Sequence, residues 1–357
     1  MIIHSTFKDY KVIIEESIDF LKKLHCDNNT QYVIDEKVYQ LYETYLDWIP
    51  QDRLILVEAT EQNKIIDTAL NICEKMTELP AKRNVQLISI GGGIIQDITG
   101  FVANILYRGI NWIFIPTTLL ASCDSCIGGK TSLNYKKYKN LLGTFYPPDE
   151  IYICSDFFDT LTEHDYKSGL GEVIKFNIMA GNKGLQSISE KIDALLSHDK
   201  ATINYFVETS LLFKKNFIEA DEFDRGERIK LNFAHTFGHA IETITEYNIP
   251  HGTAVAIGTI MANSISVKRS LLHSSIAQKS ENVLLKVIDI NIDALNVEVS
   301  RFINAMRKDK KQTSNSLTAI LLQNDSRFNI QLQIVHDIKI EEVSYAIKYF
   351  QDLYKNM

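Results

Sequence analysis

Three histidines and a glutamate form the pattern in this sequence that is best suited to chemistry. His235 and His239 are four residues apart, which places both imidazoles on one face of a helix, and His251 follows in the same region. Imidazole nitrogens together with one carboxylate are a common ligand set for a metal ion, and Glu172 is the candidate carboxylate. Histidines at this spacing are also found as hydrogen-bonded core residues, so the pattern leaves both interpretations open.

A run of three glycines is suited to binding a phosphate group. Gly91, Gly92 and Gly93 follow an apolar run and precede a helical pattern. Glycine permits positive φ and lets backbone N–H groups approach an anion closely, and the start of a helix adds partial positive charge, so this turn suits a pyrophosphate. The spacing is not G-x-G-x-x-G, and a tight turn without a ligand explains the three glycines equally well.

Basic side chains gather beside these two features. Cations next to backbone N–H donors are typical of a pocket for phosphate and carboxylate groups, although each one alone would be a solvated surface charge. The basic residues concerned, with two neighbouring asparagines, are Arg108, Lys130, Lys139, Asn140, Lys175, Arg228 and Asn232. Arg228 and Asn232 are four residues apart and are predicted to share a helix face, and Lys175 is predicted to line a pocket rather than the core.

The elements that must position these residues fall into two halves. In residues 1–160 short apolar runs alternate with helical patterns, which predicts an α/β, Rossmann-like nucleotide-binding domain with a mainly parallel sheet. Its strands are predicted at 31–34, 54–57, 85–90, 112–115 and 151–154, and its helices at 38–46, 64–76 and 97–106. A binding site is expected beyond the carboxyl ends of the strands.

Residues 161–357 are predicted to form a mainly α-helical domain that binds the metal and the substrate. Helical periodicity dominates there and strand signals are sparse. The predicted helices are 165–178, 202–219, 231–247 and 252–267, and one strand is predicted at 317–322.

Composition excludes several classes of function. The net charge of −7 argues against a large nucleic-acid surface, and no apolar run approaches the ~20 residues that span a membrane. The first residues lack the order of a signal peptide, and five scattered cysteines argue against a disulfide framework. Cys123 and Cys126 form a C-x-x-C without a second pair, so they are interpreted as structural thiols. We expect a cytoplasmic protein.

Taken in order along the chain, these segments resemble the 3-dehydroquinate synthase family of sugar phosphate cyclases. The matching stretches are 91–100, 107–109, 116–120, 124–131, 139–140, 172–175, 228–242 and 251–252. The likeness covers about residues 30–265, whereas the last ~90 residues match poorly. The resemblance implies the two-domain fold described above, a small anionic sugar phosphate as substrate, and a homodimer.

The resemblance also implies a role for individual residues. The metal, Zn²⁺ or Co²⁺, is expected on Glu172, His235 and His251, with His239 near the substrate phosphate instead. NAD is expected to contact Glu61, Lys64, Gly92, Gly93, Asp97, Thr117 and Thr118, with Asp124, Lys130 and Lys139 close by. The substrate is expected on Asp124, Lys130, Asn140, Lys175, Lys214, Arg228 and Asn232, and its phosphate on Arg108 and Lys139. Lys310 and Lys311 match a late lysine pair of the family.

An activity follows from the same resemblance. In this family bound NAD oxidises a secondary alcohol of the sugar phosphate to a ketone, which acidifies the neighbouring proton so that phosphate leaves by elimination. NADH then returns the hydride, and the ring opens and closes again by an intramolecular aldol step, while the metal acts as a Lewis acid. The expected reaction converts 3-deoxy-arabino-heptulosonate 7-phosphate to 3-dehydroquinate and phosphate, a lyase step of the shikimate pathway.

Some positions depart from the family's pattern. Asp224 and Thr253 stand where glutamate is usual, and Tyr135 stands where histidine is usual. The run 134–140 resembles valiolone-type cyclases. The residues that instead fit the dehydroquinate-forming branch better are Lys130, Arg228, Asn232 and His239. Valiolone-type cyclases usually lack the histidine, and inosose-type cyclases lack the pair Arg228 and Asn232.

Two other classes of protein remain as alternatives. A metal-dependent alcohol or glycerol dehydrogenase would share the glycine turn and the histidines, but a small neutral alcohol needs no lysine and arginine cluster. A binding protein that has lost catalysis would keep the fold without the near-complete set of metal, nucleotide and anion residues.

Overall fold

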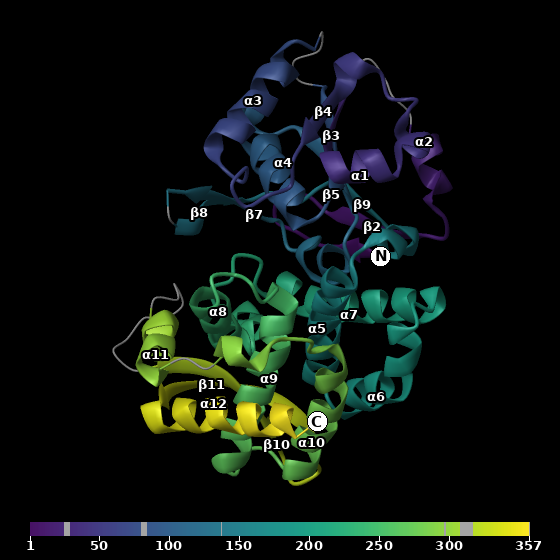
Figure 1. Cartoon of the computed structure of the whole chain (residues 1–357). Helices are drawn as coiled ribbons and strands as arrows, with labels where there is room; N and C mark the ends of the chain where they lie inside the picture. Colours follow the sequence, from purple (N-terminus) through teal and green to yellow (C-terminus); the bar gives the residue numbers. More distant parts are fainter. Residues whose placement is uncertain (25–28, 80–83, 137, 296–297, 308–316, 357) are drawn as a thin grey trace. The chain divides into compact units, whose positions relative to one another are not determined.

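The computed structural model describes residues 1–24, 29–79, 84–136, 138–295, 298–307 and 317–356 (Figure 1). The chain divides into two compact units. Unit 1 comprises Met1–Leu161 and Ile218–Phe223, and unit 2 comprises Thr162–Phe217 and Asp224–Met357. The division differs from the sequence-based boundary after residue 160 chiefly in the short segment Ile218–Phe223.

Unit 1 is built on a seven-stranded sheet with the order β1-β2-β9-β6-β5-β3-β4. All its neighbouring strands run parallel except β1 and β2. The strands are β1 Ile2–Ile3, β2 Tyr10–Glu15, β3 Thr30–Asp35, β4 Leu54–Val57, β5 Gln86–Gly91, β6 Asn111–Pro116 and β9 Glu150–Cys154. The five strands predicted from the sequence are confirmed. Tyr32, Val33 and Ile34 are all buried in succession, as expected of a parallel strand that is covered on both faces.

The helices of unit 1 follow the strands, as the alternation of patterns predicted. They are α1 Glu36–Leu41, α2 Glu43–Leu46, α3 Ile66–Thr77 and α4 Gly93–Ile105. The predicted helix 38–46 is divided at Tyr42, and α4 begins at Gly93, four residues before the predicted start. The glycine run therefore forms the first turn of α4 as well as the end of β5.

A hairpin in unit 1 was not predicted. Strands β7 Lys130–Tyr135 and β8 Tyr138–Phe145 pair antiparallel, whereas the sequence predicted no strand between residues 115 and 151. The side chains of β8 are intermediate or exposed along its whole length, so the strand lacks the apolar alternation that identifies a half-buried strand.

The segment Ile218–Phe223 belongs to unit 1 because two carboxylates hold the N-terminal residues. The backbone N–H of His4 donates to Glu219 Oε1 at 2.8 Å, and that of Thr6 donates to Glu222 Oε2 at 2.8 Å. The ring of Phe223 also meets Phe7 edge to face.

Unit 2 is mainly helical. Its helices are α5 Glu163–Met179, α6 Asn182–Leu196, α7 Lys200–Ala220 (whose last turn joins unit 1), α8 His235–Ile244, α9 His251–Lys268, α10 Ser274–Leu284, α11 Val299–Arg307 and α12 Ile340–Lys355. Strands β10 Leu317–Asn324 and β11 Ile330–Ile338 form an antiparallel pair. Every residue from Gly252 to Ser266 is buried, so α9 is the central helix of this unit.

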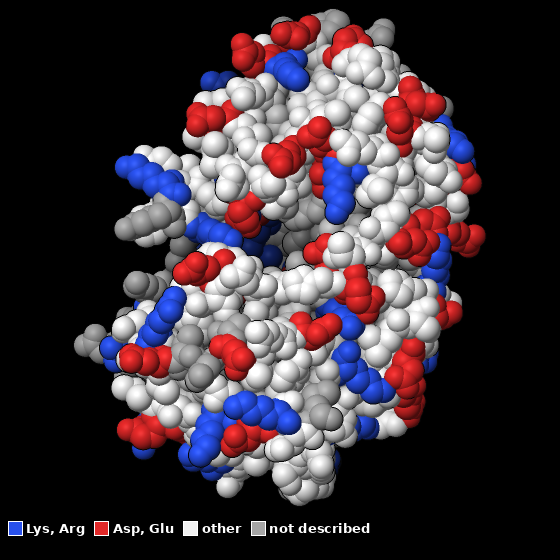
Figure 2. Space-filling view, viewed as in Figure 1, with Lys and Arg blue, Asp and Glu red and all other residues white. Residues whose placement is uncertain are grey.

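Short helical turns connect these elements. The 3-10 helices are Ile18–Lys23, Gln51–Arg53, Leu106–Arg108, Ser155–Thr160, Glu227–Asn232, Leu285–Val287 and Ile292–Leu295, and a π turn covers Ala121–Ser125. Among the described helices, none combines the length and the apolar character needed to cross a membrane. Lysine and arginine side chains are interspersed with acidic ones on the face shown in Figure 2.

The predicted helix 231–247 was wrong in its first turn. The chain forms the 3-10 helix Glu227–Asn232, passes through Ala234 at φ +69°, and begins α8 only at His235. Helix α9 packs closely against this break, because a Cβ on Gly258 would lie 2.5 Å from the carbonyl oxygen of Ala234. A contact this close between two backbones cannot be predicted from local periodicity.

Candidate metal and nucleotide sites

Glu172, His235 and His251 come together in unit 2. One potential ligand atom from each lies within 4.8 Å of the other two. The Nε2 atoms of His235 and His251 are 3.4 Å and 3.3 Å from the same carboxylate oxygen, Glu172 Oε1. Two imidazoles and one carboxylate are a ligand set of catalytic zinc sites, so the donor chemistry fits a divalent metal ion.

A contact between glycines positions this cluster. A Cβ on Gly171 would overlap with Gly252 O, and one on Gly252 would overlap with Ser168 O. Helices α5 and α9 therefore touch through their backbones, one residue away from Glu172 and from His251. Any side chain at either glycine would push the carboxylate and the imidazole apart.

The second nitrogen of each imidazole is also held. His235 Nδ1–H donates to Phe233 O at 3.1 Å, and His251 Nδ1 lies 3.2 Å from Glu242 Oε2. Burial alone would lower the pKa of His251, but the carboxylates of Glu242 and Glu172 outweigh burial and raise this pKa to about 10. In the metal-free protein these carboxylates therefore favour a protonated His251.

Lys175 pairs with the buried carboxylate. Its Nζ lies 2.6 Å from Glu172 Oε2, one helical turn away on α5, and donates to Leu231 O at 3.3 Å. The side chain of Lys175 is 1% exposed and that of Glu172 is 0% exposed. Lys175 is thus a buried residue, whereas the sequence suggested a pocket cation outside the core.

The other candidate residues of unit 2 lie on α8 and on the segments before it. His239 is half-buried on α8 and forms a second possible ligand group with Glu242 and His251. Arg228 is buried and Asn232 is half-buried on the 3-10 helix Glu227–Asn232. A 3-10 helix has three residues per turn, so these two side chains do not share a face, contrary to the prediction. Lys214 is buried on α7.

In unit 1, the glycine turn lies at the carboxyl edge of the sheet. Gly91 on β5 is in register with Pro116 on β6, and the N–H of Thr117 donates to Gly91 O at 3.0 Å. A Cβ on Gly92 would lie 3.2 Å from Thr118 Cγ2. Gly92, Gly93, Thr117 and Thr118 are therefore neighbours.

In this turn, lack of space rather than positive φ requires glycine at position 91. Gly91–Gly93 are absent from the described residues with positive φ, and Gly92 has φ −81°. A Cβ on Gly91 would lie 2.6 Å from Ile95 Cγ1, so a side chain there would clash with α4. The turn therefore does not use the positive φ that glycine permits, and Gly91 is required by its close approach to Ile95.

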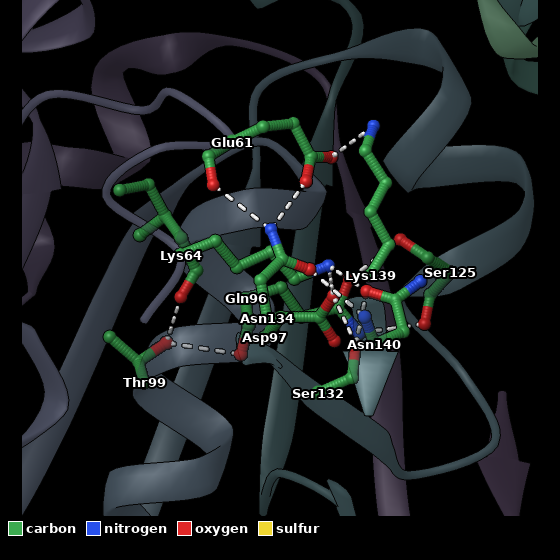
Figure 3. Close-up of polar contacts among 11 residues, drawn as sticks. Glu61, Lys64, Gln96, Asp97, Thr99, Ser125, Ser132, Asn134, Lys139 and Asn140 are labelled. Carbon is green, nitrogen blue, oxygen red and sulfur yellow. Dashed lines mark hydrogen bonds and ion pairs between the residues drawn. The ribbon is translucent and has the colours of Figure 1, made fainter. Parts of the chain in front are cut away.

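Five predicted residues meet in one polar network of unit 1 (Figure 3). Lys64, nearly fully buried, forms an ion pair with Asp97 and donates to Asn140 Oδ1 at 2.7 Å. Lys139 lies 3.7 Å from Glu61. Burial raises the pKa of the Asp97 carboxyl, against the opposing effect of Lys64.

Asn134 joins this network although the sequence did not single it out as a site residue. Its Nδ2 donates to Glu61 O at 2.9 Å and to Glu61 Oε2 at 2.8 Å, and its Oδ1 accepts from the N–H of Asn140 at 2.9 Å (Figure 3). Ser132 Oγ also donates to Asp97 Oδ2 at 3.0 Å. No sequence signal identified these contacts, because they depend on the unpredicted hairpin.

The remaining candidate residues of unit 1 are more exposed. Lys130 begins β7 and is exposed, Arg108 is exposed at φ +69°, and Asp124 is half-buried in the π turn Ala121–Ser125. Gln96 and Ser125 link this turn to α4 through hydrogen bonds of 2.7 Å and 2.6 Å.

Two further sequence predictions concern the late lysine pair and the C-x-x-C cysteines. Lys310 and Lys311 lie outside the described residues. Cys123 and Cys126 are buried free thiols, with Sγ atoms near Leu120 O and Ser122 O.

Comparisons with known proteins cover both units. Residues 54–168 match the family model for the 3-dehydroquinate synthase N-terminal region, and residues 169–312 match the model for the C-terminal region. A 3-dehydroquinate synthase from Clostridium tetani is 34% identical over 351 residues, which covers 95% of this chain and 92% of that protein.

Two solved structures share the fold. A 2-epi-5-epi-valiolone synthase from Streptomyces hygroscopicus subsp. jinggangensis, with NAD⁺ and Zn²⁺ bound, has a TM-score of 0.82 at 20% identity and covers 96% of this chain and 97% of its own. A 2-deoxy-scyllo-inosose synthase, complexed with carbaglucose-6-phosphate, NAD⁺ and Co²⁺, has a TM-score of 0.83 at 20% identity and covers 99% of both chains. The predicted fold, an α/β half followed by a mainly helical half, is confirmed.

Proposed function

The chain belongs to the 3-dehydroquinate synthase family, and we propose that it converts 3-deoxy-arabino-heptulosonate 7-phosphate to 3-dehydroquinate and phosphate. Curated relatives with this name are 34–36% identical to the chain over most of its length. The single observation that carries the proposal is the convergence of Glu172, His235 and His251, because this ligand set suits a Lewis-acidic metal ion.

We propose NAD and a divalent metal, Zn²⁺ or Co²⁺, as cofactors. The metal would be held by Glu172, His235 and His251, whose donor atoms already face one another. NAD would lie at the glycine turn and the polar network, on Glu61, Lys64, Gly92, Gly93, Asp97, Thr117 and Thr118. When bound, NAD supplies a hydride acceptor and the metal supplies Lewis acidity. Structures that share this fold contain NAD⁺ with Zn²⁺ or Co²⁺, which supports the choice.

The proposed substrate contacts are mainly lysine, arginine and asparagine side chains, with one aspartate and one histidine. An anionic sugar phosphate needs paired charges and hydrogen-bond donors, which lysine, arginine and asparagine provide. The proposed residues are Arg108, Asp124, Lys130, Lys139, Asn140, Lys175, Lys214, Arg228, Asn232, His239 and Lys310. Lys175 would also neutralise Glu172 and hold its carboxylate in place, since their charged atoms are 2.6 Å apart.

An assay with purified protein tests the reaction. The protein is incubated with NAD, Zn²⁺ and the heptulosonate phosphate, and phosphate release and the ring product are measured. We expect stoichiometric phosphate and 3-dehydroquinate, with no net gain in the near-ultraviolet absorbance of NADH. Parallel incubations with sedoheptulose 7-phosphate and glucose 6-phosphate test the valiolone- and inosose-type alternatives.

Two results would contradict the proposal. Cyclisation of another sugar phosphate, with no phosphate released from the heptulosonate phosphate, would assign a different cyclase activity. Accumulation of NADH with a simple alcohol would assign a dehydrogenase.

We further propose that the protein is a homodimer and has no nucleic-acid or membrane partner. We also propose that it works in the cytoplasm, in keeping with the free thiols at Cys123, Cys126 and Cys154.

A further inference from the structure

Glu242, on α8, contacts a candidate metal ligand from the side opposite to the metal position. We propose that Glu242 is a positioning residue, whose carboxylate fixes the ring of His251 so that Nε2 is directed at the metal. The inference rests on the proposed metal site. Glu242 itself would not bind the metal.

The geometry places the two carboxylates at opposite ends of one imidazole. Glu242 Oε2 is 3.2 Å from Nδ1 of His251, and Glu172 Oε1 is 3.3 Å from Nε2 of the same ring. A carboxylate only accepts, so Nδ1 carries the proton in this contact. A neutral ring protonated at Nδ1 has its lone pair on Nε2, which is the nitrogen that faces Glu172 and His235.

His251 needs such a partner more than His235 does. The side chain of His251 is 30% exposed, against 11% for His235. The ring of His235 is already held by a backbone carbonyl, Phe233 O. His251 is the first residue of α9, where the backbone groups left over by the helix are N–H donors rather than carbonyls. A side-chain acceptor is therefore the group suited to hold its Nδ1–H.

Glu242 also belongs to a second group of possible ligands, with His239 and His251. A neutral His251 ring has one nitrogen lone pair that can bind a metal ion. It can therefore bind a metal with Glu172 and His235 through Nε2 (the first group), or with His239 and Glu242 through Nδ1 (the second group), and not both. The first group contains the fully buried Glu172 and a ring, His235, whose Nδ1 is a hydrogen-bond donor. That arrangement favours Nε2 and leaves Glu242 as the hydrogen-bond acceptor.

Metal affinity tests the proposal directly. Zn²⁺ binding is measured by competition with a chromophoric chelator for the parent protein, Glu242→Ala, Glu242→Gln and His251→Ala. We expect one equivalent of Zn²⁺ in the parent and an affinity about 10–100-fold lower in Glu242→Ala, the usual effect of losing such a partner. Glu242→Gln should lose less of the Zn²⁺ affinity, because its amide oxygen can still accept a hydrogen bond from Nδ1–H of His251. Glu246→Gln, an exposed glutamate four residues on, is the matched control and should bind as the parent does.

A second readout separates positioning from general loss of structure. In the Zn²⁺-loaded parent, the Nδ1 proton of His251 should exchange slowly with solvent by nuclear magnetic resonance, and in Glu242→Ala it should exchange faster while circular dichroism stays unchanged. If the parent and Glu242→Ala have the same Zn²⁺ affinity and the same exchange rate of the His251 Nδ1 proton, the positioning role of Glu242 is overturned, while the metal site itself is not. Two equivalents of Zn²⁺ in the parent, one of them lost in Glu242→Ala, would make Glu242 a ligand. Full metal retention by His251→Ala would overturn the metal site as well.

Discussion

At the scale of single residues, burial changes what Lys175 does. Lys175 and Glu172 are both removed from water, and an isolated charge in such a place is strongly destabilising. Each charge is compensated by the other at 2.6 Å, so the lysine stabilises the carboxylate while no metal is present. The same carboxylate is the one directed at His235 and His251, which links the stability of the site to its chemistry.

The substitution Lys175→Ala should therefore affect both turnover and stability. We expect turnover to be lost and the free energy of unfolding of the metal-free protein to fall by about 3 kcal/mol, because Glu172 keeps a buried charge without its lysine. Added Zn²⁺ should stabilise the variant more than the parent, since the cation replaces the missing charge. Urea unfolding monitored by circular dichroism measures both effects.

The control for this substitution lies on the same helix. Lys167→Ala removes a surface pair with Glu163, 3.3 Å apart, and should cost less than about 1 kcal/mol. Equal unfolding free energies for the parent and Lys175→Ala would show that the buried pair contributes nothing to stability.

At the scale of elements, one amide joins three segments of unit 1. Asn134 on β7 donates twice to Glu61 and accepts from the backbone of Asn140 on β8, and its own N–H donates to Lys64 O. Asn140 is held at φ +52°, a conformation that asparagine tolerates better than most residues. The loop before α3 and the β7–β8 hairpin are thereby held together.

Asn134→Asp should loosen this junction. An aspartate cannot donate to Glu61 and would repel its carboxylate, and hydrogen bonds to charged groups contribute about 1.5–3 kcal/mol. We expect the Kd for NAD to rise about tenfold, with Zn²⁺ affinity unchanged, as measured by fluorescence titration and chelator competition. Asn63→Asp is the matched control, because Asn63 makes the same two bonds to Glu58 at an exposed position. An unchanged Kd for NAD in Asn134→Asp would remove the junction from the nucleotide site.

Arg269 joins three elements of unit 2 in a similar way. At the end of α9 it donates to Glu342 on α12 at 2.6 Å and to Asp337 on β11 at 2.8 Å. The hydrogen bond from Arg269 lowers the pKa of Glu342 below its ordinary value of 4.5. A carboxyl whose folded pKa is lowered stabilises the protein above its unfolded pKa and loses this contribution as pH falls through the folded pKa.

The lowered pKa of Glu342 determines how its contribution to stability depends on pH. Glu342→Gln should be less stable than the parent at pH 7, and the difference should shrink as pH falls below 4.5. Chemical unfolding at several pH values measures it. Glu341→Gln, an exposed neighbour in the same first turn, should show no such pH-dependent difference. A difference that stays constant from pH 7 down to the lowest pH at which both proteins remain folded would assign the stabilisation to packing rather than to charge.

At the scale of the whole molecule, the two candidate cofactor sites lie in different compact units. The metal ligands lie on α5, α8 and α9 of unit 2, and the glycine turn and the polar network lie in unit 1. The two family models divide the chain at nearly the same place, between residues 168 and 169. Each cofactor should therefore stabilise mainly its own unit, because a ligand stabilises the state to which it binds.

Hydrogen exchange with mass spectrometry can test this division. Zn²⁺ alone should slow exchange most in α5 and at the starts of α8 and α9, and NAD alone should slow it most at the start of α4 and in the β7–β8 hairpin. Removal of Zn²⁺ by a chelator should reverse only the first set of changes. Protection by Zn²⁺ that is strongest in the first turn of α4 would contradict the assignment.

The sequence by itself predicted five strands of the parallel sheet and the helices α5, α7, α8 and α9, because apolar periodicity is a local property that survives folding. It also identified Glu172, His235 and His251, since residue types and long motifs can be recognised without coordinates. Only the tertiary structure decided how the side chains meet. The contact between Gly171 and Gly252, the late start of α8 and the contact from Glu242 to His251 all depend on packing between segments far apart in the chain. Periodicity carries no information about such distances.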